Sequence, residues 1–178
     1  MKKFIFVALT ALFLVSCGKE KSESENENNA EVEVKDLDKF SINFEGLYKL
    51  DDSLSLVYKK NGYWDFDHPV SLKIIGQDTP QKFTINIPEG DYLENFQITL
   101  STNKDQKEIQ LNSIQVFLNE NIMFDGKSMV YVPYFNANEG LKWIEEKKAL
   151  ELFFGGKYPP GISGNEKFEQ SLQSGDVK

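Results

Sequence analysis

The sequence predicts an all-β protein, an antiparallel β-sandwich of jelly-roll type with at most one or two short helices near the C-terminus. Two observations support this class. After residue 38, apolar side chains such as Phe40, Ile42 and Phe44 alternate with polar ones, the pattern of strands that bury one face. Turn residues separate these segments at intervals of about 8–12 residues, which is typical of sandwiches and barrels.

The predicted elements follow in chain order. In the segment 108–118 the alternation slips by one residue at Asn112 and Ser113, which predicts a bulge or a turn. Helix is predicted for 138–150, capped by Asn138, and for 164–172, where Phe168 and Leu172 lie four residues apart. Strands are predicted at 39–45, 53–59, 70–76, 82–87, 95–102, 108–118, 128–135 and 149–154.

The start of the chain has the pattern of a secretory signal peptide. Two lysines precede an uncharged apolar run over 4–15, too short for a membrane span of roughly 20 residues. The alternative is a first core helix of a cytosolic domain, which should be amphipathic, whereas this run is apolar all round. We therefore assign residues 1–16 to a signal peptide.

The residues Leu14-Val15-Ser16-Cys17 resemble the lipobox of bacterial lipoproteins, and Cys17 is the only cysteine of the chain. The resemblance implies cleavage before Cys17, a diacylglycerol on its sulfur and usually an acyl chain on its amine. Two or more acyl chains hold a protein stably on a membrane. We expect lipid anchoring in the cell envelope, at the outer membrane, with the periplasmic or surface side left open.

Residues 17–38 form the predicted acidic tether. From residue 18 to 38 there are 8 acidic residues and 3 lysines, a net charge of −5. Such a segment has too little apolar surface to fold, so we expect disorder. An acidic stretch after a lipidated cysteine also resembles a signal for surface display, and a plain solvated linker is the alternative. Residues 39–178 then form one β-sandwich domain, large enough to fold without disulfides.

Composition and motifs exclude several functional classes. The chain has no arginine and a net charge of −8, which argues against a nucleic-acid partner. No nucleophile elbow, phosphate-binding loop or paired cysteines occur, and His68 is the only histidine. We therefore predict no catalytic residue, no metal and no cofactor.

The segment 61–69 holds the densest group of functional side chains. Asp65 and Asp67 are spaced so that they could act as the two carboxylates of a glycosidase, and the alternative is a solvated acidic edge of a strand. In an extended segment Tyr63, Asp65 and Asp67 would share one face, and Trp64, Phe66 and His68 the other.

The aromatic residues near polar loops suggest binding. Aromatic faces stack on the apolar C–H faces of sugars while amides and carboxylates bind the hydroxyl groups, and the same residue types serve protein interfaces. Partial burial in the fold is the structural alternative for each one. The predicted ligand-binding residues are Tyr63, Trp64, Asp65, Asp67, Tyr134 and Trp143.

Residues 56–74, 81–88 and 93–116 together resemble sandwich domains found beside bacterial cell-surface glycan enzymes. The resemblance implies a jelly-roll or galactose-binding-like sandwich. The relatives often read "LRLD" where this chain has "FQITL", so an arginine and an acid that they carry are absent. We expect a lipid-anchored binding domain whose partner is a glycan or an envelope protein. A structural or accessory interaction protein and a glycoside hydrolase acting through Asp65 and Asp67 are the alternatives.

Overall fold

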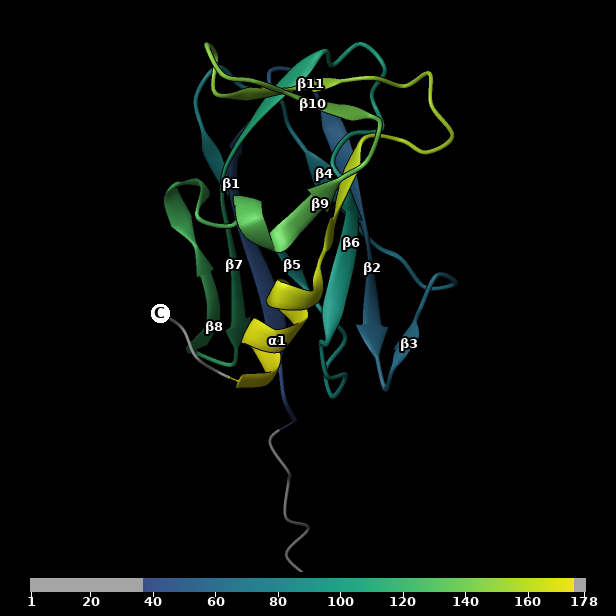
Figure 1. Ribbon diagram of the computed structural model, residues 1–178, viewed down its shortest axis with the longest axis vertical. Helices are drawn as coiled ribbons and strands as arrows, with labels where there is room; N and C mark the ends of the chain where they lie inside the picture. Colours follow the sequence, from purple (N-terminus) through teal and green to yellow (C-terminus); the bar gives the residue numbers. More distant parts are fainter. Residues whose placement is uncertain (1–36, 175–178) are drawn as a thin grey trace, which may run out of the picture. The chain divides into compact units, whose positions relative to one another are not determined.

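The computed structural model describes residues 37–174. Two six-stranded antiparallel sheets pack against each other and confirm the predicted all-β sandwich (Figure 1). The predicted signal peptide, Cys17 and nearly all of the acidic tether lie outside the described residues, as do residues 175–178.

The first sheet has the strand order β10-β11-β7-β1-β5, with β8 also paired to β7. All of its pairs are antiparallel. The long strand β7 has two neighbours on one side, because its start pairs with β11 and its end pairs with β8. Its strands are β1 (Phe40–Leu47), β5 (Gln81–Asn86), β7 (Glu108–Leu118), β8 (Asn121–Gly126), β10 (Leu141–Ile144) and β11 (Ala149–Leu152).

The second sheet has the order β3-β2-β6-β12-β9, with β4 also paired to β2. It too is antiparallel throughout. Its strands are β2 (Asp52–Lys60), β3 (Tyr63–Trp64), β4 (Val70–Ile74), β6 (Asn95–Thr99), β9 (Phe135–Ala137) and β12 (Gly161–Gly164).

The predicted irregularity in 108–118 is a β-bulge. Glu45 of β1 lies opposite Ser113 while Gly46 lies opposite Leu111, so Asn112 is the extra residue of β7. The bulge keeps the apolar residues on the buried face on both sides of the slip.

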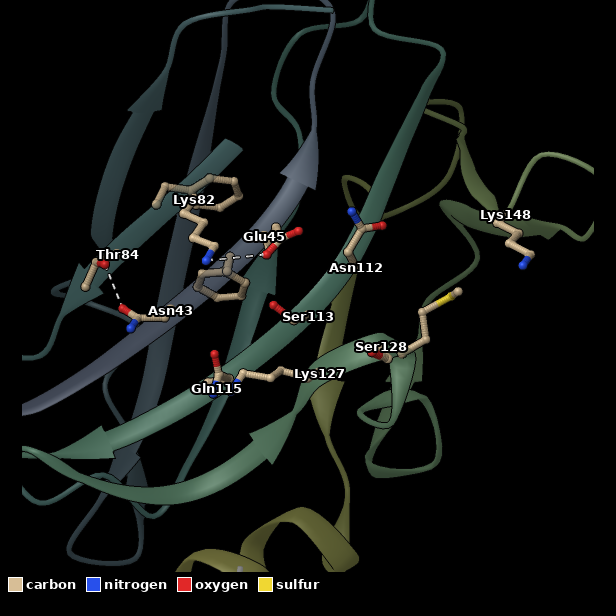
Figure 2. Close-up of a pocket in the computed structure, with 13 residues that line it drawn as sticks. Asn43, Glu45, Lys82, Thr84, Asn112, Ser113, Gln115, Lys127, Ser128 and Lys148 are labelled. Carbon is tan, nitrogen blue, oxygen red and sulfur yellow. Dashed lines mark hydrogen bonds and ion pairs between the residues drawn. The ribbon is translucent and has the colours of Figure 1, made fainter. Parts of the chain in front are cut away.

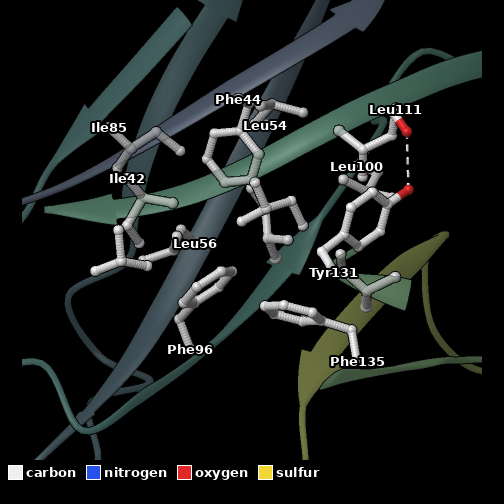
Figure 3. Packing of buried hydrophobic residues seen from close by; sticks show 14 of the residues in the cluster. Ile42, Phe44, Leu54, Leu56, Ile85, Phe96, Leu100, Leu111, Tyr131 and Phe135 are labelled. Atoms are coloured by element: carbon white, nitrogen blue, oxygen red, sulfur yellow. Dashed lines mark hydrogen bonds between the residues drawn. The ribbon is translucent and has the colours of Figure 1, made fainter. Parts of the chain in front are cut away.

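The core lies between the two sheets and is apolar and rich in aromatic rings. Phe44 from the first sheet contacts Phe96 from the second edge to face, with ring centroids 6.3 Å apart. Figure 3 shows Tyr131 reaching into this layer, where its buried hydroxyl donates to the Leu111 carbonyl oxygen at 2.9 Å. The alternating residues predicted to point inward are therefore the ones that join the sheets.

Helix α1 (Glu166–Ser174) confirms the predicted C-terminal helix. The Asn165 side chain caps it by accepting from the amides of Lys167 and Phe168 at 3.0 and 3.3 Å. Phe168 and Leu172 are buried on one helix face. The helix contacts β8 of one sheet and β6 and β12 of the other, so it covers an open side of the sandwich.

The helix predicted over 138–150 is wrong. This segment is the hairpin β10-β11, in which Leu141 lies opposite Leu152 and Trp143 opposite Leu150. Pairing of β11 with β7 extends the first sheet, and this tertiary contact overrides the local helical preference. Asn138 caps no helix; its side-chain oxygen accepts from the amides of Gly140 and Gly161.

The strand predicted over 128–135 is also wrong for most of its length. The 3-10 turns η1 (Lys127–Met129) and η2 (Val132–Tyr134) occupy it, and only Phe135 enters strand β9. Left-handed backbone at Ser128 and Met129 breaks the extended conformation, and Pro133 has no amide to donate to a strand neighbour.

No helix in residues 37–174 combines the length and the apolar composition needed to cross a lipid bilayer.

Candidate functional site

The segment 61–69 forms a hairpin turn followed by a loop. Asn61 and Gly62 both have positive φ, at 51° and 78°, as a two-residue hairpin between β2 and β3 requires. Only Tyr63 and Trp64 are in a strand, and the chain then leaves the sheet. The predicted alternation of two faces therefore ends near residue 65.

Asp65 holds this loop in place. Its carboxylate lies 2.9 Å from His68 Nδ1, accepts from the His68 amide at 3.2 Å and pairs with Lys60 Nζ at 3.3 Å. The hydrogen bonds from His68 and Lys60 lower the pKa of Asp65. A glycosidase acid needs the opposite shift. Asp67 is exposed and makes no hydrogen bond or ion pair with any residue of the described range 37–174.

Phe66 is the most prominent apolar side chain of the loop. Its ring stacks on Trp64, with centroids 6.1 Å apart and planes at 29°, while 62% of its surface stays exposed. Trp64 is half-buried and pairs through its backbone with Lys59 of β2. Trp64 therefore supports Phe66, and Phe66 presents an aromatic face to solvent.

Phe66 and Tyr158 line a groove of about 290 Å³ on the outer face of β6, β12 and β9. We call it the aromatic groove. Tyr158 is 51% exposed and comes from the loop that leads into β12, far from Phe66 in the sequence. The fold thus brings two exposed rings from distant segments to one face of the second sheet.

The floor of the aromatic groove is polar. Ser163 of β12 lies opposite Gln97 of β6 on one side and Asn136 of β9 on the other. Thr99 continues the floor two residues along β6, where it lies opposite Gly161. Within residues 37–174 none of the side chains of Gln97, Thr99, Asn136 and Ser163 makes a hydrogen bond to the protein.

The loop that carries Tyr158 is held rigidly. The Asn138 side chain donates to the Pro159 carbonyl oxygen at 2.8 Å, and the Leu100 amide donates to the Pro160 carbonyl at 2.8 Å. Both prolines restrict φ. A Cβ on Gly161 would lie 2.7 Å from the Ile98 carbonyl oxygen, so close strand pairing requires glycine there. The groove is therefore built before any ligand arrives.

The other predicted binding residues lie elsewhere. Tyr134 is half-buried and packs edge to face on Phe124, with centroids 5.0 Å apart. Trp143 is on β10 of the first sheet, where its indole nitrogen donates to Glu145. Tyr63 is 79% exposed at the tip of the β2-β3 hairpin. None of the three lines the aromatic groove, and neither do Trp64, Asp65 and Asp67.

A second groove, of about 800 Å³, lies on the outer face of the first sheet. Its lining mixes apolar and polar side chains and includes three lysines, Lys82, Lys127 and Lys148 (Figure 2). We call it the lysine groove. Neither groove holds a metal-binding cluster, because the described residues contain no group of three or more histidine, cysteine, aspartate or glutamate side chains arranged for a metal.

No protein-family model, curated protein or solved structure matches this chain.

Sequence reasoning placed Phe66 beside Trp64 but did not select it for binding. It missed Tyr158, Gln97, Asn136 and Ser163 entirely. A tyrosine directly before two prolines was the available signal for Tyr158. The floor residues carried none, because outward-facing polar residues are ordinary on half-buried strands.

Proposed function

We propose that this protein is a non-catalytic, lipid-anchored binding protein of the cell envelope, and that the aromatic groove binds a glycan. A single observation supports this most strongly. Two exposed aromatic rings flank four amide and hydroxyl side chains that have no hydrogen-bond partner within residues 37–174. Sugars offer both apolar C–H faces and hydroxyl groups, so one ligand satisfies both parts of the groove.

The groove suits recognition more than chemistry. Its lining includes aromatic, aliphatic, amide and hydroxyl groups and no carboxylate. Asp65 is occupied by Lys60 and His68, and its pKa is lowered, so it does not serve as a proton donor to a leaving group. These features favour a binding function over glycoside hydrolysis.

The anchor is supported by the sequence alone. The resemblance of Leu14–Cys17 to a lipobox implies acylation of Cys17, and the acidic segment that follows would separate the domain from the lipid surface. A domain held there meets polymers of the envelope. In this proposal the groove binds the glycan, and the anchor places the protein at the lipid surface.

A neutral-glycan array, followed by affinity measurements on the best ligand, tests the proposal. We expect Phe66→Ala and Tyr158→Ala each to weaken binding at least about tenfold, since buried aromatic contacts dominate binding energies. Trp64→Ala should weaken binding less, because Trp64 acts by supporting Phe66.

Trp143→Ala is the matched control. It removes a partly exposed aromatic ring from the other sheet and should leave the affinity unchanged. Binding that survives both Phe66→Ala and Tyr158→Ala, or that depends on Trp143 instead, would contradict the proposed site.

A further inference from the structure

Most non-glycine residues with left-handed backbone in the described domain line the lysine groove. In residues 37–174 five non-glycine residues have positive φ, and two of them are Asn61 and Asn119, a residue type that tolerates this conformation. The other three are Ser128, Met129 and Lys148, at φ 51°, 64° and 49°. All three line the lysine groove.

This strain is held in place by the surrounding fold. The Val130 amide donates to the Lys127 carbonyl at 3.0 Å, and Tyr131 fixes the following turn through its bond to Leu111. Lys148 closes the β10-β11 hairpin, where its amide donates to the Glu145 carbonyl at 3.2 Å. Left-handed backbone at ordinary residues costs free energy, persists where the surrounding structure holds it, and clusters at binding and active sites.

The charge of the groove is opposite to that of the chain. The whole chain carries a net charge of −8, whereas three lysines and one acid, Glu45, line this groove. Lys82 lies 4.0 Å from Glu45, and Lys127 lies 3.6 Å from Asp125. Lys148 forms no ion pair with any residue between 37 and 174.

Between the lysines lie polar groups without partners. Asn112, Ser113 and Gln115 of β7 line the groove, and their side chains make no hydrogen bond to the protein within the described domain. Figure 2 shows the three lysines at separate points around Asn112 and Ser113. The bulge at Asn112 allows this residue and Ser113 both to line the groove although they are neighbours.

We propose that the lysine groove is a second binding site, specific for an anionic saccharide. The lysine ammonium groups attract the carboxylates of such a saccharide, while the amide and hydroxyl groups of Asn112, Ser113 and Gln115 bind its hydroxyl groups. Without arginine the site has no planar fork for bidentate anion binding, so recognition combines point charges with hydrogen bonds. The site is separate from the aromatic groove, since the two lie on the outer faces of different sheets.

Titration of the purified protein with oligogalacturonate, and with the same oligosaccharide methyl-esterified, tests this. We expect the acidic form to bind, to weaken with added salt, and to bind more tightly than the ester. Lys148→Asn should weaken binding about fivefold, the effect of one charge at contact distance in water. The same variant should raise the melting temperature, because asparagine accepts the left-handed backbone.

Further variants separate this site from a general charge effect. Lys82→Gln should also weaken binding, and folding should be unaffected because the side chain is 84% exposed. Lys73→Asn removes an equal charge from β4 on the other sheet and should change nothing. Phe66→Ala should leave this binding intact, so failure here is distinguishable from failure of the aromatic groove.

Any one of the following results would overturn the proposal. Neither saccharide binds, or the ester binds as well as the acid. Lys148→Asn and Lys82→Gln both leave the affinity unchanged, or Lys73→Asn lowers it equally. Inorganic phosphate displaces the oligosaccharide at an equal concentration of charged groups, which would identify a site for free anions instead.

Discussion

Single side chains at the edge of the core connect core packing to the surface grooves. Tyr131 is the clearest case, because its ring fills the core while its hydroxyl bonds the Leu111 carbonyl oxygen at 2.9 Å. Burial raises the pKa of this phenol. Tyr131 also follows the strained turn that lines the lysine groove, so it connects core packing to that surface.

Tyr131→Phe should lower the free energy of unfolding by about 1–2 kcal/mol. The variant keeps the ring but removes a buried hydrogen bond and leaves the Leu111 carbonyl without this donor. Urea unfolding at pH 7 measures the effect. Tyr63→Phe, which removes an exposed hydroxyl, should have no measurable effect, and an equal loss in both variants would contradict this role for Tyr131.

At the scale of elements, helix α1 is fastened to the second sheet by a charged pair. Lys59 Nζ lies 2.6 Å from Glu169 Oε1, and the Asn95 amide donates to Glu169 Oε2 at 3.1 Å. These hydrogen bonds, that from Lys59 above all, lower the pKa of Glu169. The ionised form is therefore favoured in the folded protein, and its contribution to stability is present near neutral pH.

Glu169→Gln should lower the free energy of unfolding by about 1 kcal/mol at pH 7. Because the folded-state pKa is lowered, the Glu169 contribution is full above the unfolded pKa near 4.3 and is lost as the pH falls through the folded value. The difference between parent and variant should therefore shrink below about pH 4. Urea midpoints at pH 7, 5 and 3 measure this.

The matched control for this experiment is Glu166→Gln, in the first turn of the same helix. Glu166 is exposed and forms no ion pair with a residue of the described chain, so only the small interaction with the helix dipole is lost. A difference between parent and Glu169→Gln that does not depend on pH would show that the charge of Glu169 is not what stabilises the helix.

Sequence periodicity predicted most strands of five or more residues but missed β8, and of the shorter strands it found only β11 in full. Strands β1, β2 and β7 have enough residues to show alternation, and the slip at Asn112 correctly indicated a bulge. Strands β3 and β12 have 2 and 4 residues, too few to show a period. Local pattern indicated β11 but not β10, because residues 141–144 become a strand only by pairing with β11, which itself pairs with β7.

The same limit applies to the binding residues. Trp64 and Phe66 are neighbours in sequence, so their association was visible. Tyr158 and Phe66 line one groove only because of the order of strands in the second sheet, and Lys148 and Lys82 line another only because of the order in the first. Sequence reasoning therefore found the Trp64–Phe66 pair, but none of the residues it selected for binding lines either groove.

At the scale of the whole molecule, we propose a domain with two binding faces that is tethered to lipid. The aromatic groove faces outward from one sheet and the lysine groove from the other. An anchor at Cys17 would leave both faces free to meet envelope polymers, because the attachment precedes the domain by about 20 residues of sequence.

Labelled palmitate tests the anchor in bacterial cells that produce the full chain. We expect incorporation into the protein and its recovery with membranes. Cys17→Ala should abolish both, because the sulfur is the proposed attachment atom. Ser16→Ala is the control, since it keeps a small residue before the cysteine and should still be labelled. Equal labelling of the parent and Cys17→Ala would contradict the anchor.

The most direct test of the central claim maps the bound glycan on the protein by NMR. The best neutral ligand from the array is titrated into labelled protein, and shifts are followed for each residue. We predict that the largest shifts occur at Phe66, Tyr158 and the floor residues Gln97, Ser163 and Asn136. Shifts confined to the first sheet, or saturable binding that leaves these residues unchanged, would contradict the account.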